Sequence, residues 1–230
     1  MNRRELLSSV VLGPALLAGL PPDGGALLPP PPGARSVKPL PFKPGALKGL
    51  SEKLLVSHHD NNYAGAVRNL AKVEEQLASL PADAPGYLVS GLRERALQFH
   101  NSMRLHEAYF ENLGGDGKRT GALATALGPG WESSFRATAL SLAGGSGWAL
   151  LMLELSTGDV LTSWSGQHTQ ALAGAVPLLV LDMYEHSYAL DYGASAAKYV
   201  DAFFQNLKWD EVERRYTAAL AASRAWRGSS

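Results

Sequence analysis

Apolar residues recur every three or four positions along two long stretches in the first half of the chain, which is the spacing of a buried helix face. The first stretch starts at Ser51, a residue type that caps helices, and extends to about Leu80. After a break at 81–86 that contains proline and glycine, the second stretch runs from Leu92 to Leu113. Two long helices joined by a short break predict an antiparallel helical hairpin. Three polar residues lie on the otherwise apolar faces, namely His58, Asn62 and His106.

The second half of the chain changes from helical spacing to short apolar runs. Three of these runs predict strands, and they lie at 147–155, 159–164 and 176–181. Helices are expected around them, at 120–127, 132–142, 194–207 and 209–222. The whole pattern predicts an α+β fold, with a long N-terminal antiparallel helical hairpin followed by a C-terminal domain with a three-stranded antiparallel sheet flanked by helices.

The remaining segments complete the expected domain organisation. We assign 1–39 to a signal-like segment and a proline-rich linker, because ten of the fourteen prolines lie between Pro14 and Pro44 and such a stretch cannot sustain a helix or a strand ladder. The helical hairpin domain then covers 40–117, an α/β domain covers 118–222, and the tail at 223–230 is expected to be loose.

The N-terminal residues predict export to the periplasm or the medium. Arg3 and Arg4 precede an apolar run from Leu6 to Leu20, which is shorter than the roughly twenty residues of a membrane span. The paired arginines resemble a twin-arginine export signal. The alternative is an N-terminus that faces lipid or is disordered. With the signal removed, we expect no association with a membrane.

Composition narrows the chemistry that the chain can perform. With 230 residues, 46% of them hydrophobic, it can bury a sizeable core. Its 21 acidic and 21 basic residues give no net charge, so a nucleic-acid partner is not indicated. It has no cysteine, which excludes disulfides and thiolate metal sites, and any metal must bind to its six histidines and its carboxylates.

Asp182 and His186 form the most informative pair in the sequence. Asp182 directly follows the third apolar run, and His186 follows four positions later. A hard oxygen ligand and an imidazole held there on rigid backbone suit a first-row transition metal. His58 and His106 are less informative taken alone, because a histidine on an apolar helix face is more often a satisfied core residue than a ligand.

Five segments in the same order resemble the iron/manganese superoxide dismutases. The segment from Asp182 to Tyr188 is similar to that family's Asp-x-Trp-Glu-His-Ala-Tyr signature, with tyrosine in place of tryptophan and serine in place of alanine. The family's two helical histidine motifs, its Gly-Ser-Gly-Trp segment and its Asn-Trp-x-x-Val-x-x-Arg-Tyr ending have counterparts that begin at His58, Leu105, Gly145 and Lys208. Together these segments cover about Leu40 to Tyr216.

The resemblance implies an enzyme that converts superoxide to dioxygen and hydrogen peroxide. It implies that one iron or manganese ion, a choice that the sequence leaves open, is held with a solvent molecule by four side chains, namely His58, His106, Asp182 and His186. In that family a glutamine or histidine hydrogen-bonds the metal-bound solvent. Here Gln167 and His168 lie in the loop that supplies it, and either could equally be a solvated loop residue.

Several positions depart from the family pattern. Ala66 stands where the family has its gateway tyrosine, Asn62 where it has a neighbouring histidine, and Ala189 where it has an interface tyrosine. These losses predict a more open funnel to the metal. Tyr63 or Tyr109 could partly replace the lost hydroxyl, but packing is the favoured role of both. Of the family's aromatic cage only Trp148 is kept, and three other residues replace its tryptophans, namely Phe110, Leu150 and Tyr184.

Glu185 predicts a homodimer. The resemblance implies that it reaches the partner's metal-ligating histidine, whereas the alternative is a surface glutamate at a helix start.

Two other functions are weighed against a dismutase. A metal-binding relative without fast turnover is supported by the losses at Asn62, Ala66 and Ala189. An interaction domain without metal is disfavoured, because all four ligands occur in their motifs.

Overall fold

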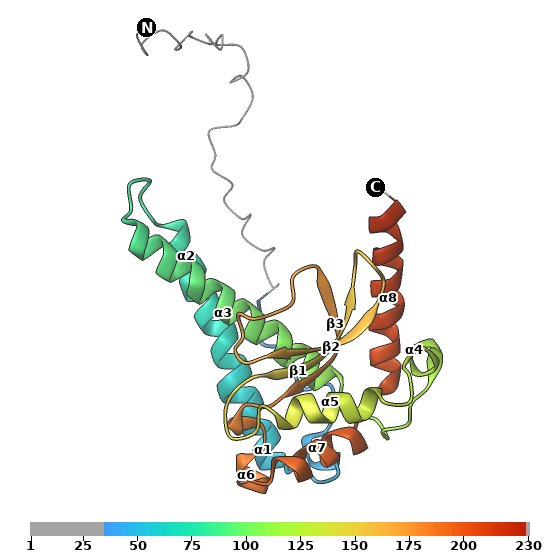
Figure 1. Ribbon diagram of the computed structural model, residues 1–230. Coiled ribbons are helices and arrows are strands. Elements are labelled where there is room, and N and C mark those ends of the chain that lie inside the picture. The colour runs from blue at the N-terminus through green and yellow to red at the C-terminus, as the bar shows by residue number, and fades with distance from the viewer. Residues whose placement is uncertain (1–34, 229–230) are drawn as a thin grey trace, which may run out of the picture. The chain divides into compact units, whose positions relative to one another are not determined.

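The computed structural model of the protein describes residues Arg35 to Gly228 (Figure 1). The predicted export signal and most of the proline-rich linker lie outside the described residues. The longer helices are α2 (Ala64–Ala78), α3 (Gly86–Glu111), α5 (Trp131–Leu140), α7 (Ala196–Gln205) and α8 (Trp209–Gly228). The strands are β1 (Trp148–Glu154), β2 (Val160–Ser165) and β3 (Ala175–Asp182). Short helical segments are η1 (Pro44–Ala46), α1 (Glu52–Ser57), η2 (His58–Tyr63), α4 (Gly121–Ala126), η3 (Glu185–Ser187) and α6 (Ala189–Tyr192).

The predicted helical hairpin is confirmed. Ser51 caps α1, since its hydroxyl accepts a hydrogen bond from the Leu54 amide at 3.1 Å. The segments α1, η2 and α2 follow one another without a break, and α3 packs against them (Figure 1). α3 begins at Gly86, six residues before the predicted start at Leu92. Its first turns are mostly exposed, so they carry no apolar periodicity that would reveal them.

The predicted three-stranded antiparallel sheet is also confirmed, in the order β2-β1-β3. The central strand β1 is the most buried, because six of its seven residues are inaccessible to solvent. Helices flank the sheet: α5 packs on β1 and β2, while α3 and α8 pack on β3 (Figure 1). A single hydrophobic core contains residues from both sides of position 117. The two parts therefore do not have separate cores, and the predicted domain boundary at 117 stays a prediction.

The prediction of a loose tail at 223–230 is wrong as far as Gly228, because α8 continues to that residue. Ser223 is fully buried, and its hydroxyl donates a hydrogen bond to the Leu155 carbonyl at 2.8 Å. This contact fastens the last turns of α8 to the end of the sheet. A small polar residue gives no apolar signal in the sequence, which is why the helix was expected to stop at Ala222. None of the helices among the described residues is both long and apolar enough to cross a membrane.

Candidate metal centre

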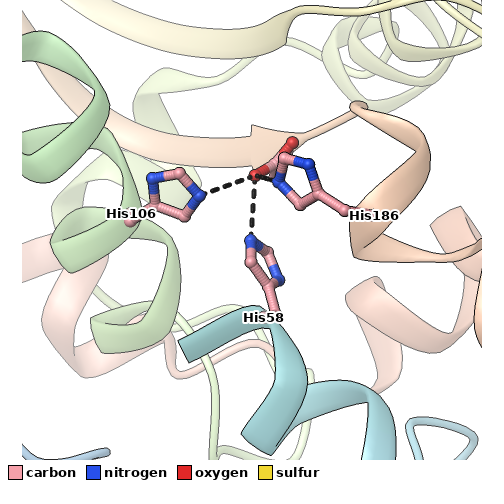
Figure 2. A group of neighbouring side chains, drawn as sticks. His58, His106 and His186 are labelled. Atoms are coloured by element: carbon pink, nitrogen blue, oxygen red, sulfur yellow. Dashed lines mark hydrogen bonds and ion pairs between the residues drawn. The ribbon is translucent and has the colours of Figure 1, made fainter. Parts of the chain in front are cut away.

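Four side chains from four separate elements converge at one point in the core. His58 is the first residue of η2, His106 lies near the end of α3, Asp182 ends β3 and His186 lies in η3. The Nε2 atoms of His58, His186 and His106 lie 3.1, 3.3 and 3.5 Å from the same Asp182 oxygen, Oδ2. Figure 2 shows the three imidazoles pointing toward that oxygen, and the four candidate ligand atoms lie within 4.8 Å of one another.

The local backbone at the end of β3 explains how Asp182 and His186 come to face each other. The second carboxylate oxygen of Asp182 accepts a hydrogen bond from the Tyr184 amide at 2.9 Å. The Asp182 carbonyl accepts hydrogen bonds from the hydroxyls of Tyr199 at 2.7 Å and Ser187 at 2.9 Å. The chain therefore turns tightly after the strand, and the next four residues bring His186 back over the carboxylate.

The local backbone around His58 is unusual as well. The helix widens from α to π geometry over η2, which begins at His58 and ends at Tyr63. Single π turns inside α-helices occur frequently at functional sites. His58 and Asp182 are almost inaccessible to solvent, whereas 27% of the His186 side chain is exposed. The cluster is thus open to solvent on the His186 side.

The electrostatics keep three members of this cluster, namely His58, His106 and Asp182, in the protonation state that a metal requires. Burial lowers the pKa of His58, and burial together with neighbouring His58 lowers the pKa of His106 to about 3. Burial alone would raise the pKa of Asp182, but its interactions with His186 and His58 outweigh burial and hold that pKa well below its usual range. Buried neutral imidazoles beside an ionised carboxylate are ready to act as ligands, since metals bind the deprotonated forms.

The hydrogen bonding of His106 shows directly that the cluster fits a cation. Its Nδ1 lies 2.7 Å from the Ser102 carbonyl, which can only accept, so Nδ1 carries the proton and Nε2 presents a lone pair. That Nε2 is buried, has no hydrogen-bond partner among the described residues, and lies 3.5 Å from a carboxylate oxygen. Two acceptors facing each other repel unless a cation lies between them. Three imidazole nitrogens and one carboxylate oxygen suit a first-row transition metal.

His168, rather than Gln167, faces this cluster. The ring of His168 lies 6.3 Å from that of His106 and stacks at 4.8 Å on Tyr184, whereas Gln167 is exposed. The indole Nε1–H of Trp148 donates to His168 Nδ1 at 3.0 Å. Because an indole nitrogen can only donate, Nδ1 is the acceptor, and Nε2 carries the proton of the neutral ring. Burial lowers the pKa of His168, which favours this neutral form.

Comparison with known proteins agrees with this geometry. The sequence profile described as iron/manganese superoxide dismutases, C-terminal domain, matches residues 128–215. The chain is 47% identical over 191 residues to a superoxide dismutase [Fe] of Cupriavidus metallidurans, with 80% of this chain and 97% of that protein covered. The chain belongs to the iron/manganese superoxide dismutase family. A superoxide dismutase [Mn] 2 of Haloferax volcanii is 35% identical over 196 residues, covering 79% of this chain and 95% of the relative. A superoxide dismutase [Fe] of Aquifex aeolicus is 31% identical over 199 residues, covering 80% and 92%.

Two of the three lost side chains leave their positions beside a pocket of about 210 Å³ that leads to the cluster. Ala66 and Asn62 both line it, together with His106, His168 and His186. The small side chain at position 66 therefore leaves space at the mouth of this cluster; whether the funnel is more open than in the family stays a prediction. Ala189 lies apart from the pocket, exposed at the start of α6.

The two tyrosines that could have replaced the lost hydroxyl are engaged elsewhere. The Tyr63 hydroxyl donates to Glu107 at 3.1 Å, and the Tyr109 hydroxyl lies 3.2 Å from that of Tyr199. Both side chains are buried, and burial raises the pKa of each. Their positions support packing as the role of both, although the Tyr109 ring lies only 5.2 Å from that of His58.

The remaining aromatic positions divide into residues at the site and residues away from it. Trp148 meets His106 edge to face at 5.1 Å, and Tyr184 stacks on His186 at 5.4 Å. Phe110 meets His58 at 5.1 Å. Leu150, by contrast, lines a separate groove of about 610 Å³ between α3, the sheet and α8. Three tryptophan positions of the family's cage are thus filled by smaller side chains, one of which lies outside the site.

Sequence reasoning missed two residues that support the site. Ser102 fixes the protonation of His106 through its carbonyl, and Asn101 donates from Nδ2 to the His168 carbonyl at 2.7 Å, which holds the loop against α3. Ser102 lies one helical turn before His106, so helical spacing alone could have suggested it. The contact of Asn101 joins residues 67 positions apart, and no local pattern reveals it.

Proposed function

We propose that this protein is a superoxide dismutase whose single iron or manganese ion is held by His58, His106, Asp182 and His186. The observation that carries the proposal is the buried His106 Nε2, which presents a lone pair to a carboxylate oxygen at 3.5 Å. When bound, the metal supplies a one-electron couple between its +3 and +2 states. Over one cycle, two superoxide ions and two protons become dioxygen and hydrogen peroxide.

The side chains around the metal contribute access, charge and protons. The pocket lined by Ala66 and Asn62 admits a small anion as far as His186. Neutral imidazoles and one ionised carboxylate leave a bound cation with net positive charge, which attracts superoxide. His168 supplies a hydrogen-bond donor, because Trp148 occupies its Nδ1 and leaves the proton on Nε2. Of Gln167 and His168, we therefore propose His168 as the residue that donates toward the reacting oxygen atoms.

Turnover and metal content, measured on the same purified sample, test this function. We expect about one iron or manganese ion per chain and fast dismutation, and elemental analysis names the metal. His186→Ala should lose metal and activity together, since it removes one of four ligands. Unchanged metal content in that variant would refute the ligand assignment. About one ion per chain with negligible turnover would instead favour a metal-binding relative without catalysis, which the curated relatives do not support.

We further propose that the protein forms a homodimer through Glu185. This glutamate is exposed, stands next to His186 and has no ion-pair partner among residues 35–228. A twofold interface would let it reach the His186 of the partner subunit, which is the exposed ligand of the cluster. Sedimentation equilibrium should give twice the mass of the chain. Glu185→Ala should shift this equilibrium toward the monomer, and a monomeric wild-type protein would contradict the proposal.

A further inference from the structure

Lys38 lies in the segment that leads into the hairpin and contacts both of the helices that carry histidine ligands. Its amide donates to the Tyr63 hydroxyl at 3.0 Å, and its carbonyl accepts from His59 Nε2 at 2.7 Å. Its ammonium donates to Glu107 Oε2 at 3.1 Å. One residue thus uses its amide, its carbonyl and its side chain on three different partners.

Two of these partners directly follow proposed ligands, and the third ends the segment that His58 begins. His59 follows His58, Tyr63 ends the π-helical segment that His58 begins, and Glu107 follows His106. The hydrogen bonds of Lys38 therefore fasten both ends of η2 and connect it with α3. Because the rings of His58 and His106 lie 5.0 Å apart, a shift of either helix would change the spacing of the ligand atoms.

The Glu107 carboxylate is the buried centre of this network. Only 6% of its side chain is exposed, and it accepts hydrogen bonds from Lys38, from the Tyr63 hydroxyl and from Arg104 at 2.8 Å. A buried carboxylate is costly unless such donors surround it. Tyr63 and Arg104 belong to the hairpin itself. Lys38 is the donor that arrives from outside the hairpin, so it links the entering chain to the ligand helices.

We propose that Lys38, which lies within the predicted linker, is a positioning residue for the metal centre. Arg35 forms an ion pair with Glu74 of α2, which fastens the same segment at a second point. The inference rests on the proposed function, since it concerns how firmly His58 and His106 are held. It predicts that the lysine side chain slows the loss of metal.

The test uses the full-length, metal-loaded protein and measures release of the ion to an excess of chelator. Lys38→Met should release metal about fivefold faster, a smaller effect than the roughly 10- to 100-fold loss of metal affinity or activity that follows replacement of a direct partner of a ligand. Lys38→Arg keeps a donor and should restore the wild-type rate to within about twofold. Lys43→Met removes an exposed lysine of the same segment and should release metal at the wild-type rate.

Asn206→Ala is the control for a merely structural role. Asn206 holds the same segment through two hydrogen bonds to the Lys48 backbone, at 2.9 and 2.7 Å, and it does so from the end of α7. It should lower the free energy of unfolding without speeding metal release. The inference is overturned if Lys38→Met releases metal at the wild-type rate. The inference is also overturned if Asn206→Ala and Lys38→Met lower the free energy of unfolding equally and speed metal release equally.

A second measurement separates this inference from the proposed function. In the metal-free protein, hydrogen exchange of the amides from His58 to Tyr63 should be several-fold faster in Lys38→Met than in wild type, and unchanged in Asn206→Ala. If the wild-type protein binds neither iron nor manganese, the proposed function fails, while this exchange still decides whether the Lys38 side chain orders the π-helical segment through Glu107. Equal exchange in Lys38→Met and wild type would refute that ordering.

Discussion

The buried ligand set should make the metal-free protein sensitive to acid, and His106 is the residue on which this is best measured. Its pKa is about 3 in the fold, against an ordinary value of 6.5. The unfolded chain therefore binds a proton at this position between pH 6.5 and pH 3, whereas the folded chain does not. By linkage, the stabilisation is complete above pH 6.5 and is lost as the pH falls toward 3. One pKa unit is worth about 1.4 kcal/mol, so the full loss is roughly 5 kcal/mol.

Urea unfolding of the metal-free protein at a series of pH values measures this loss. Between pH 6.5 and pH 4.5, His106 alone should lower the free energy of unfolding by roughly 2.3 kcal/mol, because the unfolded histidine is already half protonated at pH 6.5. His106→Gln lacks this titration, so its pH dependence should be shallower by that amount. His58 and Asp182 remain in both proteins and lose stabilisation in the same direction, since both pKa values are lowered. Parallel curves for wild type and His106→Gln over this range would refute the reasoning.

Three further predictions follow from the pocket, the indole and the N-terminus. Ala66→Tyr narrows the pocket and should change turnover without changing metal content, and a loss of metal would show that position 66 supports the ligands instead. Trp148→Phe removes one hydrogen bond to His168, worth about 1 kcal/mol, and should lower turnover about fivefold at unchanged metal content. Replacing Arg3 and Arg4 together by lysine should leave the protein in the cytoplasm, as fractionation would show; continued export would contradict a twin-arginine signal.

Periodicity was sufficient to predict the architecture, because helices and strands bury apolar faces at different spacings. The hairpin and the three strands follow from that contrast, whereas the order of the strands in the sheet does not. Periodicity does not predict the ends of an element where its residues are exposed or where buried polar groups hold it in place. The exposed first turns of α3 from Gly86 carry no apolar pattern, and the end of α8 is fixed by the buried hydroxyl of Ser223.

The ligands could not be predicted from periodicity in the same way. His58 and His106 lie on apolar faces and are inaccessible to solvent, just as satisfied core histidines would be. Only their motifs, and then their convergence on Asp182, distinguish them. Sequence reasoning does not choose between Gln167 and His168, because the loop has no periodicity and the proposal of His168 rests on its hydrogen bond with Trp148, a residue twenty positions away.

The function proposed above assigns two opposite tasks to the same residue type, and the hydrogen-bond partner of each ring decides which task it takes. His106 meets a carbonyl at Nδ1, so its proton lies there and Nε2 is left as a lone pair for a cation. His168 meets an indole N–H at Nδ1, so its proton lies on Nε2 and can be donated. Neither the Ser102 carbonyl nor the Trp148 indole titrates in the physiological range. The division between ligand and donor is therefore set by geometry, and a change of pH near neutrality does not exchange the two roles.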